Sequence, residues 1–182
     1  MKKAVIFFAD GFEECEGLVV VDLLRRAGIE VATASVMGRK EITSSHSIKL
    51  QADCLAEEAD YEAADIVILP GGMPGTKYLG ESDIVKKQCL AFAGNSGKYI
   101  AAICAAPTVF AALGLLEGKE AICYPGMRGN MRGAVLSENN VAVSGNIITG
   151  EALGAAIPFA LKIIEELIDK ETAENVASSI CY

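Results

Sequence analysis

The chain has 182 residues, of which 52% are hydrophobic, and its formal net charge at pH 7 is -8. This length fits a single domain, residues 1–182, with a sizeable core, and the acidic balance argues against a nucleic acid or an anionic membrane surface as a partner. The apolar stretch after Lys2 and Lys3 is too short for a signal-peptide core, and no apolar run reaches the roughly 18 residues of a membrane span. We therefore expect a cytoplasmic protein.

Apolar runs and helical patterns alternate along the chain. Strands are predicted at residues 3–8, 30–35, 65–69, 99–103, 141–143 and 146–149. Helices are predicted from residue 13 or 14 to 27 and at 82–93, 108–116, 152–168 and 172–179. A polar surface hairpin is predicted at residues 40–50, and residues 118–140 are glycine-rich and irregular. The alternation indicates a mainly parallel sheet with helices on both faces.

Six cysteines and one histidine are spread along the chain. Because the sequence has no CxxC pair, we predict no metal site. A chain of this size without a leader is not expected to carry a disulfide framework. Most of the cysteines are interpreted as packing residues, and for Cys123, near the glycine-rich segment, a second oxidisable thiol is the alternative.

Cys104 needs a separate argument. The strand predicted at residues 99–103 runs directly into it, and Pro107 then opens a helix, a position that suits the fixed φ and missing N–H of proline. Open α/β sheets place ligands at such strand ends, and the free N–H groups of a helix start favour a thiolate. We therefore weigh a reactive cysteine against a small buried packing residue.

Two other predicted strand ends carry residues that can serve such a cysteine. Glu16 begins the apolar face of the first helix, so its carboxyl is expected to point inward. If ionised, it would raise the pKa of a neighbouring thiol, and if protonated it would donate a hydrogen bond to sulfur; the sequence leaves both open. Gly71 and Gly72 follow the strand at 65–69, and they form either an ordinary turn or an oxyanion hole of backbone N–H groups.

Several motifs together resemble the ThiJ/PfpI superfamily, also called the DJ-one family, over essentially the whole chain. They are Gly11-Phe12-Glu13-Glu14-Cys15-Glu16, Arg25-Arg26-Ala27-Gly28-Ile29, Ile68-Leu69-Pro70-Gly71-Gly72 and Ala101-Ala102-Ile103-Cys104-Ala105-Ala106-Pro107. The resemblance implies a flavodoxin-like three-layer α/β/α sandwich with a nucleophile-elbow cysteine, in a protein that is usually a homodimer. It also implies that Cys104 is the reactive thiol, that a protonated Glu16 hydrogen-bonds it, and that Gly72 and Ala105 donate backbone N–H groups.

The sequence departs from that family at four positions. Protease-like members have a histidine directly after the cysteine, where this chain has Ala105. Closer relatives have a histidine in place of Tyr124 and an arginine in place of His46, and often another arginine at about Glu151. These departures predict a less basic pocket that suits a small neutral carbonyl compound. Tyr124 and His46 remain pocket candidates, although the alternative for His46 is a solvated side chain.

Three functions are compatible with these residues. The first is a cofactor-free enzyme of the glyoxalase or deglycase type, which acts on small dicarbonyls and converts methylglyoxal to lactate. The second is an oxidative-stress sensor or protective chaperone that works through a sulfinate on Cys104. The third, which lacks the expected histidine, is a cysteine peptidase or amidase.

Overall fold

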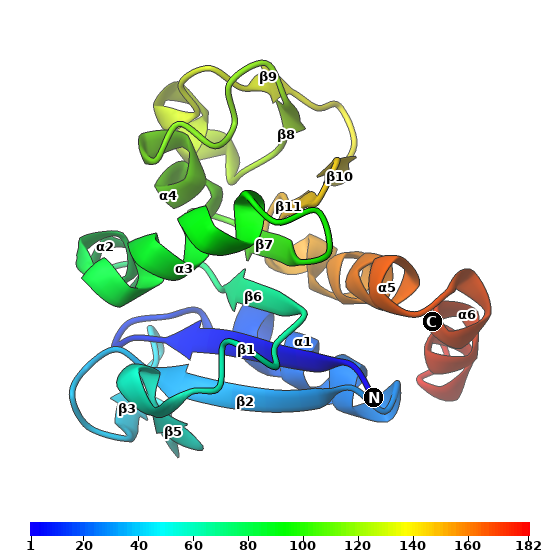
Figure 1. Cartoon of the computed structure of the whole chain (residues 1–182), viewed down its shortest axis with the longest axis horizontal. Coiled ribbons are helices and arrows are strands. Elements are labelled where there is room, and N and C mark those ends of the chain that lie inside the picture. Colours follow the sequence, from blue (N-terminus) through cyan, green and yellow to red (C-terminus); the bar gives the residue numbers. More distant parts are fainter.

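A computed structural model describes all 182 residues, and a seven-stranded sheet forms its centre (Figure 1). The strands lie in the order β10-β11-β7-β6-β1-β2-β5. Every neighbouring pair is parallel except β10 and β11, which form an antiparallel hairpin at one edge. The strands are β1 (Lys3–Phe8), β2 (Glu30–Ser35), β5 (Cys54–Leu55), β6 (Ile66–Leu69), β7 (Tyr99–Ile103), β10 (Val141–Ser144) and β11 (Ile147–Gly150).

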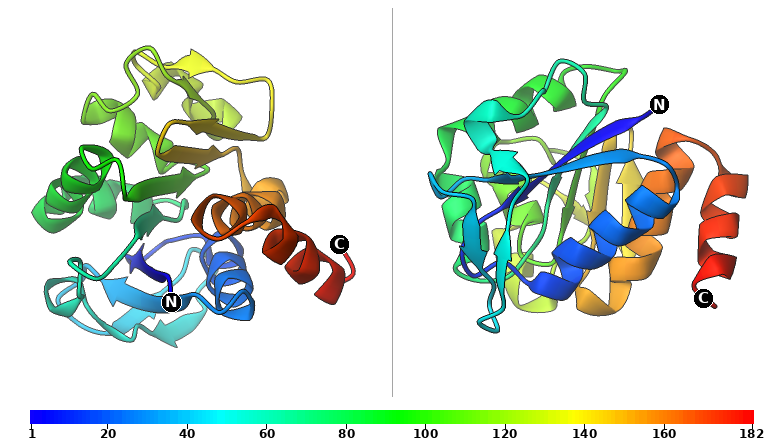
Figure 2. Two further views of the ribbon diagram at one scale, coloured as in Figure 1. Left: turned by 45° about the vertical axis from the view of Figure 1, so that its right-hand side comes forward. Right: turned by 90° about the horizontal axis from the view of Figure 1, so that it is seen from below.

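Helices cover both faces of this sheet. Two of them, α1 and α5, run side by side on one face, and α6 packs against the outer side of α5 (Figure 2). The other face is covered by α2, α3 and α4. The helices are α1 (Glu14–Arg26), α2 (Gly75–Glu81), α3 (Asp83–Ala93), α4 (Pro107–Ala112), α5 (Ala156–Leu167) and α6 (Lys170–Ser179). The predicted three-layer α/β/α sandwich is therefore confirmed.

Side chains of the central strands alternate between two buried cores. Ile6 and Phe8 of β1 belong to the core beneath α1 and α5, whereas Val5 and Phe7 belong to the core beneath α2, α3 and α4. Strands β6 and β7 alternate in the same way. Because both faces are covered, these strands consist of unbroken apolar residues, which is the pattern by which they were predicted.

Smaller elements lie around the sheet. The predicted surface hairpin is confirmed as β3 (Glu41–Thr43) and β4 (Lys49–Gln51), which pair antiparallel. Two short strands, β8 (Glu120–Ala121) and β9 (Val135–Leu136), pair parallel within the segment predicted to be irregular. Three 3-10 helices complete the chain: η1 (Ala56–Glu58), η2 (Pro125–Asn130) and η3 (Leu153–Ala155). None of the helices combines the length and apolarity that a membrane crossing requires.

Two predicted helix boundaries are wrong. The helix predicted at residues 108–116 ends at Ala112, because Gly114 adopts a φ of 73° and closes the helix with a Schellman motif. In that motif the N–H groups of Gly114 and Leu115 donate to the carbonyls of Ala111 and Phe110. The helix predicted from residue 152 begins only at Ala156, after η3, and α2 was not predicted at all.

Candidate active site

Cys104 lies at the corner between β7 and α4, as predicted. Its φ of 65° is in the left-handed region, which a non-glycine residue adopts at a cost of roughly 1–3 kcal/mol when the surrounding structure enforces it. Two backbone hydrogen bonds hold the corner. The Cys104 N–H donates to the carbonyl of Gly150 at 3.0 Å, and the Cys104 carbonyl accepts from the N–H of Tyr124 at 2.7 Å. The side chain is half-buried at the carboxyl end of the sheet.

Glu16 is the acidic partner of this cysteine. It lies in the first turn of α1, and its side chain is only 1% exposed, so the predicted inward orientation is confirmed. The carboxylate of Glu13 caps the helix by accepting the Glu16 N–H at 2.7 Å. A side-chain hydrogen bond links the Glu16 carboxyl to the Cys104 thiol. The first turn of α1 therefore carries the acid directly to the sulfur.

Gly71 allows the acid and the thiol to approach each other. A Cβ atom at Gly71 would lie 2.5 Å from the Cβ of Cys104 and 2.5 Å from Oε2 of Glu16, so no side chain fits between them. The Gly71 N–H donates to Oε2 of Glu16 at 3.1 Å. The expectation that Gly71 contributes an oxyanion donor is therefore wrong, because its N–H is already bound by the acid.

Burial, together with the negative charge of Glu13, raises the pKa of Glu16 to about 7. The hydrogen bond from Cys104 and those from backbone N–H groups oppose this rise, because they favour the carboxylate. A carboxyl with a pKa near neutrality can both give and take a proton at physiological pH, which is the property required of a general acid and base.

Cys104 is not acidic while Glu16 is ionised. Burial raises the pKa of the thiol to about 12, and the charge and hydrogen bond of Glu16 act in the same direction. The backbone donors lower this pKa, as expected, but desolvation and the neighbouring carboxylate outweigh them. The expectation of a readily formed thiolate is therefore wrong for the ionised pair. When Glu16 takes up the proton, its contribution disappears, and the carboxylic acid donates a hydrogen bond to the sulfur.

The two groups consequently titrate as a pair. The first proton leaves near pH 7 and the second near pH 12. Between these values the pair holds one proton, either on sulfur beside a carboxylate or on the carboxyl beside a thiolate. The ratio of these two forms does not change with pH in this range. The amount of thiolate paired with a protonated Glu16 therefore rises as the first proton leaves, near pH 7, and then stays constant.

Gly72 and Ala105 each provide a backbone N–H group next to Cys104. The N–H groups of Gly72 and Ala105 both form hydrogen bonds with the Cys104 sulfur, which lowers its pKa. Gly72 has a φ of 90°, and an added Cβ would lie 2.3 Å from the Glu13 nitrogen, so this position also requires glycine. These donors come from two different loops and can stabilise a negative oxygen formed on a carbon bound to the sulfur.

His46 and Tyr124, the two other predicted pocket residues, differ in how they are connected to Cys104. The His46 ring is 70% exposed, and its Nδ1 lies 2.8 Å from Oε1 of Glu14. The single histidine is therefore paired with a glutamate and forms no Cys–His pair. Tyr124 contacts Cys104 through its backbone, while its ring is 48% exposed. The residues that could hold a metal ion are Glu13, Glu14 and His46. Each offers one ligand atom, a carboxylate oxygen or a ring nitrogen, and these atoms lie within 4.8 Å of one another.

Arg128 is a charged residue near the site that was not predicted from the sequence. It lies in η2, and its Nη2 is 3.0 Å from Oε1 of Glu151. Glu151 directly follows Gly150, the residue whose carbonyl binds Cys104. Close to this ion pair, burial raises the pKa of the Cys123 thiol to about 11, and the charge of Arg128 acts in the opposite direction. No spacing in the glycine-rich segment marks Arg128, because only the fold of that segment turns it toward Glu151.

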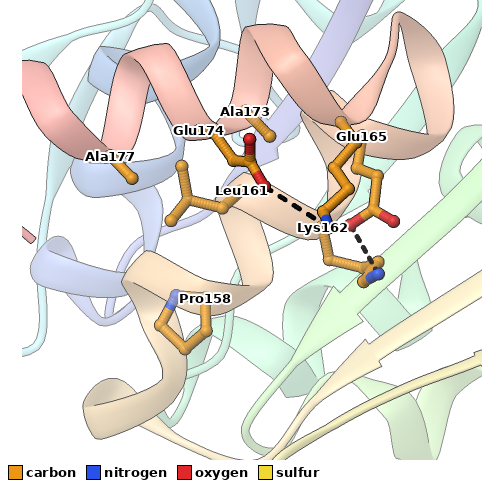
Figure 3. A pocket seen from close by; sticks show the side chains of 8 residues that line it. Pro158, Leu161, Lys162, Glu165, Ala173, Glu174 and Ala177 are labelled. Atoms are coloured by element: carbon orange, nitrogen blue, oxygen red, sulfur yellow. Dashed lines mark hydrogen bonds and ion pairs between the residues drawn. The ribbon is translucent and has the colours of Figure 1, made fainter.

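A hollow with a volume of about 200 Å³ lies away from Cys104, between α5 and α6 (Figure 3). Leu161 and Ala173 line it, together with the ion pairs Lys162–Glu165 and Lys170–Glu174. It contains no nucleophile and no residue of the site around Cys104, so we place no chemistry there.

The shared proton gives a pH dependence that can be measured. We expect the rate of Cys104 alkylation by iodoacetamide to rise through about pH 7 and then to level off, because the acid–thiolate form reaches its plateau when the first proton has left. In Glu16→Gln this inflection should be absent, and the rate should keep rising with pH. Mass spectrometry of the Cys104 peptide measures both profiles. An unchanged profile in the variant would contradict the coupling.

A model of the DJ-1/PfpI family matches residues 2–166. Protein dj-1beta of Drosophila melanogaster is 38% identical over 181 residues, which cover 98% of this chain and 96% of that protein. The glutathione-independent glyoxalase DJR-1.2 of Caenorhabditis elegans is 31% identical over 171 residues, 93% of this chain and 90% of that protein. A solved structure described as Toxoplasma gondii DJ-1, oxidized, has a TM-score of 0.95 and 36% identity and covers 100% of this chain and 99% of that one. This chain therefore belongs to the DJ-1/PfpI family.

Proposed function

We propose that the protein is a cofactor-independent enzyme that converts small 2-oxoaldehydes and water to 2-hydroxy acids, with methylglyoxal as substrate and lactate as product. The observation that carries this proposal is a buried acid with a pKa of about 7 that is hydrogen-bonded to a cysteine at a strand-to-helix corner. The relative from Caenorhabditis elegans, described as a glutathione-independent glyoxalase, supports the same class of reaction.

The reaction begins from the acid–thiolate form of the pair. The Cys104 thiolate attacks the aldehyde carbon and forms a carbon–sulfur bond, while the carbonyl electron pair moves onto oxygen. The N–H groups of Gly72 and Ala105 stabilise this oxyanion. The oxyanion then takes the proton of Glu16, which gives a neutral hemithioacetal and leaves Glu16 as a carboxylate.

The Glu16 carboxylate next moves a proton between two carbons. It removes the proton from the carbon bound to sulfur, which gives an enediolate, and returns it to the neighbouring carbon. The hydroxyl proton passes from the oxygen on the first carbon to the oxygen on the second, and the product is a 2-hydroxyacyl thioester on Cys104. Water hydrolyses this thioester, releases the 2-hydroxy acid and regenerates the thiol. The carbons exchange oxidation states within one molecule, so no external oxidant or reductant is needed.

We expect Cys104→Ser to lower lactate formation from methylglyoxal by roughly a thousandfold or more, because removal of a covalent nucleophile eliminates the chemical step. Lactate is measured enzymatically after incubation of the purified variants. Cys181→Ser, which changes an exposed cysteine, serves as the control and should retain activity. Lactate formation that does not depend on Cys104 would overturn the proposed reaction.

A redox role for the same thiol is the second candidate. It is favoured by the solved relative described as oxidized and by the three hydrogen-bond donors around sulfur, which come from Glu16, Gly72 and Ala105. Two molecules of peroxide would convert the thiolate to a sulfinate and leave two molecules of water.

Under limiting peroxide, we expect the intact mass to increase by two oxygens in the wild type and in Cys181→Ser but not in Cys104→Ser. Tandem mass spectrometry identifies the oxidised residue. If the exposed Cys15 or Cys181 is oxidised while Cys104 remains a thiol, the sensor role is excluded.

We also propose that the protein forms a homodimer through the face around the amino-terminal half of α1. Three apolar side chains there are 41–50% exposed: Leu18 of α1, Ile48 of the hairpin turn and Leu153 of η3. The hairpin turn contacts α1 through His46 and Glu14, and the Leu153 backbone donates to Glu16, so the three side chains border one region.

Leu18→Lys should weaken this dimer by at least about tenfold, because a charge in an apolar interface must be desolvated. Leu90→Lys is the matched control, because Leu90 of α3 is 47% exposed but lies on the opposite face of the sheet. Sedimentation velocity over a concentration series measures the dissociation. A wild-type protein that sediments as a monomer at all concentrations would refute the proposal.

A further inference from the structure

One buried hydroxyl in the protein has no partner. Among the buried side-chain nitrogen and oxygen atoms, only Oγ1 of Thr76 lacks a hydrogen bond. Thr76 lies in α2 and is 5% exposed. An unpaired buried hydroxyl destabilises a fold, and such exceptions in a native structure usually reflect a function or a bound molecule.

Thr76 lines an open groove of about 230 Å³ between α2, α4 and η2. The lining is largely apolar, and the residues are Met73, Thr76, Lys77, Gly80, Thr108, Val109, Ala112 and Met127. A cavity of roughly 150 Å³ is enough for a benzene molecule. The groove is therefore large enough for an aromatic ring or a short alkyl chain, but too small for a folded segment of another protein.

The lining of the groove includes residues from the three segments around Cys104, although Cys104 itself is not one of them. Met73 follows Gly72, whose N–H binds the Cys104 sulfur. Thr108 donates its hydroxyl to the carbonyl of Ala105 at 2.6 Å. Met127 donates its N–H to the carbonyl of Tyr124, the residue whose own N–H binds the Cys104 carbonyl.

We propose that this groove is a substrate subsite that takes an apolar substituent ending in a hydroxyl, and that Thr76 is its hydrogen-bond partner. This inference rests on the function proposed above, since it assigns the substrate class as 2-oxoaldehydes with an aryl or alkyl substituent rather than methylglyoxal alone. Oγ1 of Thr76 is buried in the free protein, so the proposal requires a rotation about χ1 that presents the hydroxyl to the bound substituent. Threonine in a helix populates two χ1 rotamers. The hydroxyl that is unpaired in the free protein is then paired in the complex.

Three 2-oxoaldehydes test the two parts of the subsite: methylglyoxal, phenylglyoxal and para-hydroxyphenylglyoxal. We expect the wild type to have a higher kcat/KM for both aryl substrates than for methylglyoxal. Ala112→Leu, which fills the groove from an exposed position of α4, should lower the preference for phenylglyoxal over methylglyoxal by about tenfold. Ala177→Leu makes the same change in the hollow between α5 and α6 and should leave this preference unchanged (Figure 3).

Thr76→Val tests the hydroxyl. It should lower the preference for para-hydroxyphenylglyoxal over phenylglyoxal by about tenfold, and it should raise the melting temperature because it removes an unpaired buried hydroxyl. A gain in melting temperature with an unchanged substrate preference would overturn the proposal, as would a wild type that does not prefer aryl substrates.

A binding measurement separates this inference from the proposed reaction. The unreactive ketone para-hydroxyacetophenone is titrated into Cys104→Ser by calorimetry, with and without Thr76→Val. Weaker binding in the double variant supports the subsite even if no lactate forms in the turnover assay, in which case only the reaction is refuted. Equal binding in the two proteins refutes the subsite, whatever the turnover assay shows.

Discussion

The close approach of Glu16 and Cys104 is the constraint on which the rest of this site depends. A carboxyl that is 1% exposed and a half-buried thiol meet across a glycine that has no room for a side chain. Water cannot solvate either charge fully, so burial raises the pKa of both groups, and the charge of Glu16 raises the pKa of Cys104 further. The outcome is a pair that shares one proton over the physiological range, rather than an acidic thiol next to a spectator acid.

Three separate segments create this approach. The Glu13 cap sets the start of α1 and so directs Glu16 inward. The end of β6 brings in Gly71, whose N–H holds the acid. The end of β7 carries Cys104 into a left-handed conformation that the neighbouring strand and the Tyr124 loop stabilise with two hydrogen bonds. The strands themselves are fixed by two apolar cores, so the backbone cost at Cys104 is met by the whole sheet.

This arrangement accounts for chemistry without a Cys–His pair. In a pair of cysteine and histidine, the imidazole removes the thiol proton and becomes positive. Here the only histidine is paired with Glu14, and the base available to the thiol is a carboxylate that becomes neutral when it is protonated. A neutral acid beside a thiolate suits carbonyl addition and proton transfer between carbons, whereas amide hydrolysis requires protonation of a poor leaving group.

The sequence by itself determined the layered fold, and the resemblance of its motifs to a known family singled out Cys104 and Glu16 as the candidate pair. Unbroken apolar strands such as β6 and β7 can only be buried on both faces, and Pro107 after a strand marks the corner at Cys104. The protonation of the pair, the use of the Gly71 N–H by Glu16, the position of Arg128 and the unpaired hydroxyl of Thr76 were decided only by the tertiary structure. Each of these depends on distances between groups that are far apart in the chain, and electrostatic and hydrogen-bond energies change steeply with such distances, whereas hydrophobic periodicity is a local property that the sequence displays directly.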